Sequence, residues 1–119
     1  MLLTALKAKI HRATITETDI NYNGSISVDQ DLLEAANIHN NERVEIYNIT
    51  NGARFTTYAI PAPRNSGKIA INGAASRLVH KGDLIIICAY AMVDQEEIKN
   101  ISPTVILVDK NNKKSLLHE

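Results

Sequence analysis

A glycine–serine pair in a short polar segment is the feature of this sequence with the potential for unusual chemistry. The segment reads Asn23-Gly24-Ser25. A serine hydroxyl can add to the carbonyl carbon of the preceding residue, which shifts the acyl group from nitrogen to oxygen and leaves an ester. Elimination from that ester cuts the chain and leaves position 25 as a pyruvoyl group, whose ketone is the electron sink that amino-acid decarboxylation needs. Glycine suits the attacked position because it has no Cβ and tolerates unusual backbone conformations.

The same tripeptide has simpler interpretations. Asn-Gly is the commonest signal of a two-residue hairpin turn, and it occurs three times, at residues 23–24, 51–52 and 72–73. Asn23-Gly-Ser25 also matches a glycosylation acceptor, as does Asn48-Ile-Thr50. Taken alone, the motif favours a turn, so its meaning depends on the segments around it.

The composition narrows the class of protein. At 119 residues the chain is long enough for one domain with a real core but not for two. Its 13 basic and 13 acidic side chains balance, so there is no excess of positive charge that would predict binding to nucleic acid or an anionic membrane. The sequence has neither a secretory-signal pattern nor an apolar run near the roughly 20 residues of a membrane helix. We therefore expect a single cytoplasmic domain over residues 1–119, with a polar tail from about residue 110 that frays.

Residues that commonly bind metals show no ligand pattern. Cys88 is the one cysteine and lies in the apolar run Leu84-Ile-Ile-Ile-Cys-Ala-Tyr90, so we expect an inert residue in a buried strand. The histidines also lack metal-ligand spacing; they are His11, His39, His80 and His118. We expect no metal site.

Alternating polarity predicts short strands along most of the chain. The pattern over about Leu2–Ile15 places Lys9 and His11 on one face of a strand. Ser27-Val-Asp-Gln30 matches a capping box, which predicts a short helix that ends near Asn37.

The second half of the chain continues this pattern. Arg43–Ile49 and Arg54–Ile60 alternate on either side of Asn51-Gly52, which predicts a hairpin. Further strands are expected at 69–71, 84–91 and 104–108, with helical turns after residue 72 and within 94–100. Many short strands with few helices predict a small β-barrel rather than a βαβ sheet.

Six segments of the sequence together resemble one enzyme family. They are Lys9-Ile-His11-Arg12, Tyr22-Asn-Gly24-Ser25-Ile26, Asp29-Gln-Asp31, Thr50-Asn-Gly52-Ala-Arg54-Phe-Thr-Thr57-Tyr58-Ala-Ile60, Asn72-Gly-Ala-Ala75 and Gly82-Asp83. Their order and spacing are similar to those of aspartate 1-decarboxylase, the bacterial pyruvoyl-dependent enzyme that makes β-alanine for pantothenate. The resemblance runs from about Leu3 to Val108, and its specificity lies in the whole set of segments.

The resemblance implies a fold and an assembly that the residue pattern alone does not predict. Members of the family are small six-stranded double-psi β-barrels with short helices, and they form homotetramers with active sites between neighbouring subunits. They cut themselves between the glycine and the serine, which here would give a short chain 1–24 and a long chain 25–119. Spontaneous maturation and maturation assisted by an accessory factor are both compatible with the sequence.

The resemblance also implies roles for the matching residues. Gly24 supplies the attacked carbonyl and Ser25 the nucleophile that becomes the pyruvoyl cofactor. Thr57 offers a hydroxyl that stabilises the oxyanion during processing and lies beside the substrate later. In the mature enzyme the amine of L-aspartate forms a Schiff base with the ketone, which takes up the electrons released with CO₂. Tyr58 is the expected proton donor to Cα.

A substrate with two carboxylates needs fixed positive charge. Arg54 is the best candidate because its planar fork binds a carboxylate through two hydrogen bonds. Lys9 offers a second cation, and His11 shares its face. The matching loop of small residues permits close approach to substrate; it comprises Asn72, Gly73, Ala74 and Ala75. Outside the family context, these side chains have ordinary interpretations as solvated strand charges, a surface histidine and a turn.

Three questions stay open at this level. In a regular strand Arg54 and Tyr58 share a face while Thr57 points to the other, so either the strand is irregular or its opposite faces serve sites in different subunits. A non-catalytic β-barrel module, such as a DNA-binding regulator, is a rival that the neutral charge disfavours. A self-cleaving hydrolase that keeps Ser25 as a free amino-terminal nucleophile is a second rival.

Overall fold

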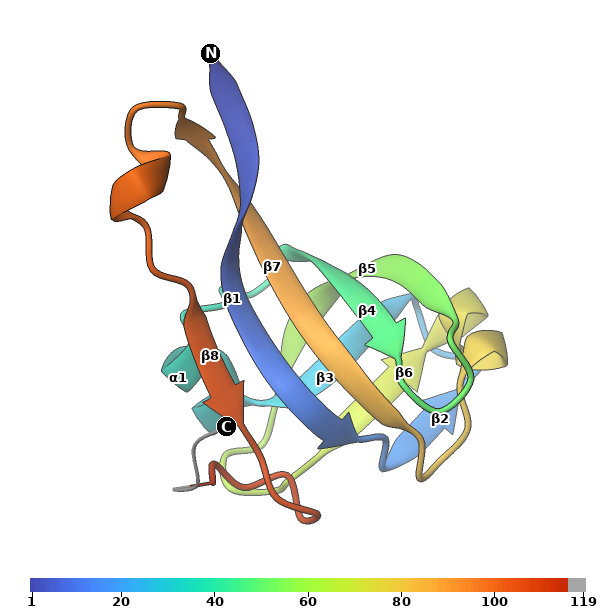
Figure 1. Cartoon of the computed structure of the whole chain (residues 1–119). Coiled ribbons are helices and arrows are strands. Elements are labelled where there is room, and N and C mark those ends of the chain that lie inside the picture. Colours follow the sequence, from blue (N-terminus) through green and yellow to red (C-terminus); the bar gives the residue numbers. More distant parts are fainter. Residues whose placement is uncertain (116–119) are drawn as a thin grey trace.

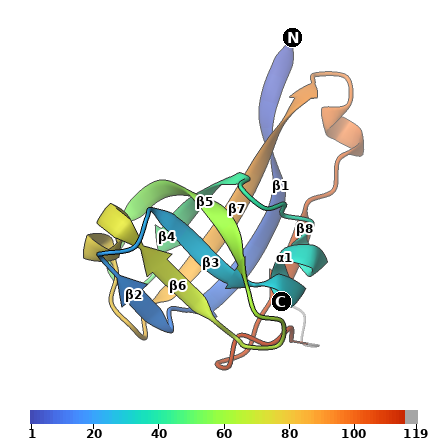
Figure 2. The ribbon, with the colours of Figure 1, turned by 180° about the vertical axis from the view of Figure 1, so that it is seen from behind.

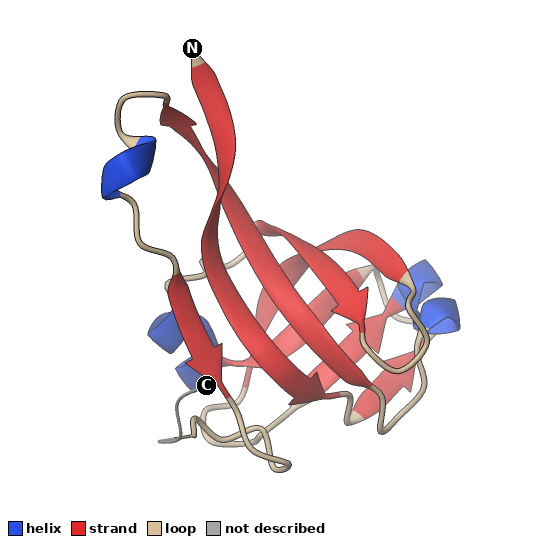
Figure 3. Cartoon of the chain, in the orientation of Figure 1, coloured by secondary structure: helices blue, strands red, loops and turns tan. Residues whose placement is uncertain are grey.

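The computed structural model describes residues 1–115, and in this part of the chain eight strands form one hydrogen-bonded sheet (Figures 1 and 3). The strands are β1 (Leu2–Thr14), β2 (Glu17–Asp19), β3 (Ser25–Asp29), β4 (Arg43–Asn48), β5 (Arg54–Ala62), β6 (Ile69–Asn72), β7 (Leu84–Asp94) and β8 (Thr104–Leu107). The helical elements are α1 (Gln30–Ala36) and the 3₁₀ turns η1 (Gly73–Leu78) and η2 (Ile98–Asn100). The prediction of a mainly β domain with short helices is confirmed.

The strands follow the order β2-β6-β3-β5-β4-β7-β1-β8 across the sheet. The sheet bends strongly, so that β1, β7 and β4 lie in front of β3 and β6 in Figure 1 and behind them in Figure 2. The N-terminal end of β1 and the C-terminal end of β7, which pair with each other, project beyond the rest of the sheet. Because this order has two edges, β2 and β8, the six-stranded double-psi barrel stays a prediction.

Isoleucine side chains fill the concave side of the bent sheet. Residues at alternate positions of several strands are fully buried, as the two-residue period of a strand requires. They include Ile10, Ile26, Ile46, Ile71, Ile85 and Ile87. Burying each side chain of this size contributes about 1.5–3 kcal/mol, so this apolar layer holds strands from both halves of the chain together. Within residues 1–115, no helix has the length and apolar character needed to span a membrane.

The helix α1 begins two residues later than the capping box predicts. Ser27 lies inside β3, where it pairs with Ile60 of β5 and Ala70 of β6. The cap is Asp29, whose Oδ1 accepts a hydrogen bond from the backbone N–H of Asp31 at 2.9 Å. Ser27 therefore belongs to a strand with a neighbour on each side, and the prediction that it caps the helix is wrong. The predicted end near Asn37 is confirmed by its left-handed conformation.

The segment before Ser25 is not a tight hairpin turn. β2 and β3 lie on opposite sides of β6, parallel and antiparallel to it, so the loop between them crosses over the end of β6. Gly24 also lacks the positive φ of such turns, whereas Gly52 has φ +81° between the paired strands β4 and β5. The hairpin interpretation is therefore wrong at residues 23–24 and confirmed at residues 51–52.

The polar segment near the C-terminus is anchored, so the expectation that it frays is wrong for residues 111–115. Asn112 is 1% exposed. Its Nδ2 donates to the carbonyl oxygens of Thr14 and Gly67 at 2.8 Å, and its Oδ1 accepts from the Thr14 N–H at 2.7 Å. Residues 116–119 of the predicted tail, with His118, lie outside the described residues.

Candidate active site

The bond between Gly24 and Ser25 joins an exposed loop to the buried start of β3. Ser25 is 1% exposed and pairs with Asn72, the last residue of β6, whereas Gly24 is exposed. The Asn72 amide Nδ2 donates to Ser25 Oγ at 3.0 Å and to Ser27 Oγ at 3.1 Å. The serine oxygen is thus held in place next to a carbonyl that belongs to an accessible loop.

The close backbone approach at this bond depends on Gly73. Gly73 has φ +74°, and a Cβ there would lie 2.8 Å from Gly24 Cα, 2.9 Å from Gly24 N and 3.2 Å from the Tyr22 carbonyl oxygen. A Cβ on Gly24 itself would meet nothing within 4 Å. The expectation that Gly24 leaves room for attack agrees with this open side, but the unusual backbone conformation is at Gly73.

The strand register places Tyr58 beside Ser25. Ile26 of β3 pairs with Ala59 of β5, and both are fully buried. The residues that precede them, Ser25 and Tyr58, lie at the same level on neighbouring strands and on the opposite face. Tyr58 is 39% exposed, so its phenol lies at the surface near Ser25.

Thr57 lies on the core side of β5. It pairs with Val44, which is 1% exposed, while Arg54 and Tyr58 point to the outer face. The strand is therefore regular at these positions, and Thr57 and Tyr58 face opposite sides of β5. Thr57 stays half-buried at this end of the sheet.

The predicted cations lie on one outer face of the sheet but far apart. The register aligns His11, Ile86, Tyr47 and Arg54 in one row across β1, β7, β4 and β5. Lys9 lies on β1 in the next row of the same face. Because β7 and β4 lie between β1 and β5, the strands of Lys9 and Arg54 are three strand spacings apart, roughly 14 Å. Arg54 is also about 13 Å along β5 from Tyr58. One chain therefore does not bring Arg54 and Lys9 together at Ser25.

Two tyrosines that the sequence analysis did not select support Arg54. The Arg54 guanidinium lies over the ring of Tyr47, 4.6 Å from its centroid, a cation–π geometry. The Tyr47 hydroxyl lies 2.8 Å from that of Tyr90 on β7. This hydrogen bond and partial burial raise the pKa of Tyr90 above its usual value. The sequence pattern that identifies Tyr47 as a neighbour of charged residues is the alternation over residues 43–49, which places it on the same face as Arg43 and Glu45.

Other expectations concern cysteine and metals. Cys88 is 3% exposed on β7, and burial raises the pKa of its thiol, so the predicted buried position is confirmed. Among residues 1–115, no group of three His, Cys, Asp or Glu side chains is arranged to hold a metal ion.

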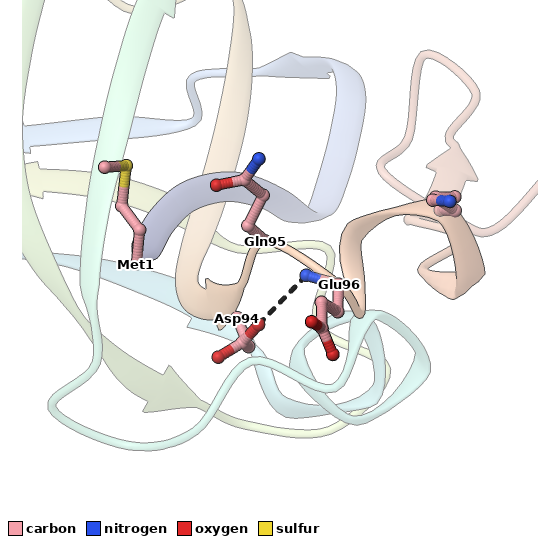
Figure 4. A pocket seen from close by; sticks show the side chains of 5 residues that line it. Met1, Asp94, Gln95 and Glu96 are labelled. Atoms are coloured by element: carbon pink, nitrogen blue, oxygen red, sulfur yellow. Dashed lines mark hydrogen bonds between the residues drawn. The ribbon is translucent and has the colours of Figure 1, made fainter.

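Two surface grooves differ in their relation to these residues. One of about 340 Å³ has a lining that includes Tyr22, Ser27, Ile60, Lys68 and Asn72. A larger groove, of about 770 Å³, lies at the projecting end of β1 and β7 (Figure 4). Its lining residues are Met1, Asp94, Gln95, Glu96 and Lys99. The smaller groove is the one that contacts the predicted site.

Comparisons with known proteins show which family the sequence matches. The sequence model of the family described as "Aspartate decarboxylase" matches residues 1–115. A relative named aspartate 1-decarboxylase from Caulobacter vibrioides is 59% identical over 112 residues, which cover 94% of this chain and 95% of the relative. A protein of the same name from Phenylobacterium zucineum is 56% identical over 94% of this chain and 95% of its own length. Another, from Neisseria meningitidis, is 57% identical over 95% of this chain and 89% of its own length. The chain belongs to the aspartate decarboxylase family.

Proposed function

We propose that this decarboxylase, a lyase, cuts its own chain between Gly24 and Ser25 and then converts L-aspartate into β-alanine and CO₂. The observation that carries the proposal is the contact between Asn72 Nδ2 and Ser25 Oγ, at 3.0 Å, beside the exposed Gly24. This contact fixes the oxygen that would attack, next to a carbonyl in an accessible loop. The relatives' names supply the substrate.

In the proposed cleavage, Ser25 Oγ attacks the Gly24 carbonyl carbon and the C–N bond breaks. The hydroxyl proton passes to the Ser25 nitrogen, so the products of this step are an ester and a free amine. Loss of the proton from the Ser25 Cα then expels Oγ with Gly24 as a carboxylate. The dehydroalanine that remains reacts with water and releases ammonia, which leaves a ketone at position 25. Asn72 orients the attacking oxygen. Thr57 lies on the face of β5 opposite to Tyr58, so its hydroxyl is assigned to the oxyanion on Gly24 of a neighbouring subunit.

The pyruvoyl group supplies the electron sink for decarboxylation. Around it, Tyr58 lies beside position 25 on β5 and is the proposed proton donor to Cα of the product. Asn72 and η1 border the same position. Ala74 is exposed and Ala75 half-buried, so they are the proposed substrate contacts of this loop, while the buried Gly73 packs against Gly24.

Arg54 is the proposed ligand of the carboxylate that stays on the product. Within residues 1–115 it makes no ion pair, and its stacking on Tyr47 leaves the N–H groups at the guanidinium edge available for two hydrogen bonds. Because Arg54 and Lys9 lie far from Ser25 of the same chain, we propose that they and His11 act at the ketone of a neighbouring subunit. This assignment requires an oligomer with sites between subunits, and a homotetramer is the proposed form.

The remaining parts of the proposal concern fold and context. The strongly bent sheet is compatible with a six-stranded double-psi barrel, with β2 and β8 as additions at its edges. β-Alanine made by the enzyme would serve pantothenate and coenzyme A synthesis in the cytoplasm, and an accessory maturation factor remains compatible with the exposed loop at Gly24.

Intact mass of the purified protein tests the proposal. We expect two chains, 1–24 and 25–119, and a long chain lighter than one beginning with serine by the elements of one ammonia. Ser25→Ala removes the attacking hydroxyl and should stay whole and inactive toward aspartate. A long chain beginning with serine would instead indicate an amino-terminal nucleophile hydrolase, and an intact wild-type chain would indicate a binding module.

A further inference from the structure

We propose that Ser27 is a positioning residue for self-cleavage, because it fixes the Asn72 amide whose other N–H holds Ser25 Oγ. This inference rests on the proposed cleavage at Gly24–Ser25. It concerns a residue that was interpreted from the sequence only as a helix cap.

The geometry uses both hydrogens of one amide group. Ser25 and Ser27 are two residues apart on β3 and therefore share a face. Asn72 pairs with Ser25 on β6 and donates from Nδ2 to both hydroxyl oxygens, at 3.0 and 3.1 Å. An asparagine NH₂ has two N–H groups, so the two serines account for both of them. All three side chains are buried, with 1%, 9% and 5% exposure.

Ser27 restricts a torsion that is otherwise soft. The terminal torsion of asparagine has broad minima, so an amide with a single partner can rotate and withdraw its N–H from Ser25 Oγ. A second acceptor on the same face defines the plane of the Asn72 amide. Ser27 and Asn72 also line the smaller surface groove, and the Ser27 hydroxyl accepts the N–H that would otherwise be left for solvent.

The fixed N–H matters at the first chemical step. As Ser25 Oγ attacks, it loses its proton and becomes a stronger hydrogen-bond acceptor, so a donor already in place stabilises the change. Because Oγ accepts in this contact, its own hydrogen is not used there and can pass to the Ser25 nitrogen as the C–N bond breaks. Ser27 contacts no reacting atom and acts only through Asn72.

The test measures cleavage of freshly purified precursor by intact mass over time. We expect Ser27→Ala to slow cleavage at least tenfold and Ser27→Thr, which keeps the hydroxyl, to restore it to within about threefold of wild type. Ser27→Cys keeps the volume with a weaker acceptor and should fall between them. Thermal unfolding of each precursor reports whether the variant is folded.

A double-mutant cycle separates action through Asn72 from a general effect. If Ser27 acts through the amide, Ser27→Ala should add less than twofold to the defect of Asn72→Ala. Wild-type cleavage in Ser27→Ala, or multiplicative effects of the two substitutions, would overturn the inference. Ser25→Ala, run in parallel, tests the underlying proposal. If that variant is cut, or the wild type is never cut, both proposals fail. An uncut Ser25→Ala with normal cleavage of Ser27→Ala rejects only the role of Ser27.

Discussion

Gly73→Ala is the substitution that most directly tests how the cleavage bond is held. The new Cβ would lie 2.8 Å from Gly24 Cα and 2.9 Å from Gly24 N, both backbone atoms. A left-handed conformation costs a non-glycine residue about 1–2 kcal/mol, and an overlap of this kind costs about 1–3 kcal/mol more if nothing moves. Because the loop at Gly24 is exposed, the easiest relief is for it to move away by roughly 0.6 Å, to an ordinary contact distance of 3.4 Å.

Such a movement should affect cleavage more than folding. A misplacement of about 1 Å can slow a reaction about 10²-fold, so we expect Gly73→Ala to cleave roughly 10- to 100-fold more slowly. Gly52→Ala is a matched control, because Gly52 has φ +81° and a Cβ there meets nothing within 4 Å. The control should lose about 1–2 kcal/mol of stability and cleave normally. Equal cleavage rates in the two variants, measured by intact mass, would refute the reasoning.

Further variants address the other side chains. Thr57→Val should accumulate uncut precursor, whereas Tyr58→Phe should mature but lose about 10²–10⁴-fold in turnover; normal maturation and turnover in both would reject these roles. Arg54→Lys, fully processed, should lower kcat/KM for aspartate at least about tenfold, or 1.4 kcal/mol, because it loses the bidentate fork; an unchanged value would remove Arg54 from the site. The hydrogen bond from Asn48 lowers the pKa of Asp83, so the carboxylate stabilises the fold above its unfolded pKa, and this contribution is lost as the pH falls through the folded pKa. The stability advantage of wild type over Asp83→Asn in urea should thus shrink below about pH 4, and a constant difference would contradict it.

The sequence predicts strands well where one face is buried and the other is exposed. The alternation in Arg43–Ile49 and Arg54–Ile60 correctly predicts the hairpin β4–β5, and the long N-terminal pattern predicts β1. β3 was missed because all five of its residues are buried. A strand covered on both faces does not alternate, and its hydroxyl and carboxylate side chains match a helix cap equally well. The local sequence pattern at Ser27 therefore indicates the start of a helix where the structure has a strand.

The site was predicted by resemblance, and its contacts came only from the structure. Asn72 and Ser25 are 47 residues apart, and no local pattern indicates that β3 and β6 are neighbours. Tyr47 was visible only as one member of an alternating strand, since its role beneath Arg54 depends on the register between β4 and β5. Sequence spacing gives the face of each strand, but not which strands pair.

The pairing of the first two strands has a consequence for the order of folding and cleavage. A cut after Gly24 places β1 and β2 on a separate peptide, yet β1 pairs with β7 and β8, and β2 pairs with β6. The peptide would stay in the fold through these hydrogen bonds and its share of the core. Once the mature protein is denatured, however, refolding becomes an encounter between two molecules and depends on their concentration. In the uncut chain these parts are joined and need no such encounter, so the proposed cleavage would turn one folded chain into a two-chain complex that is best assembled before the bond is broken.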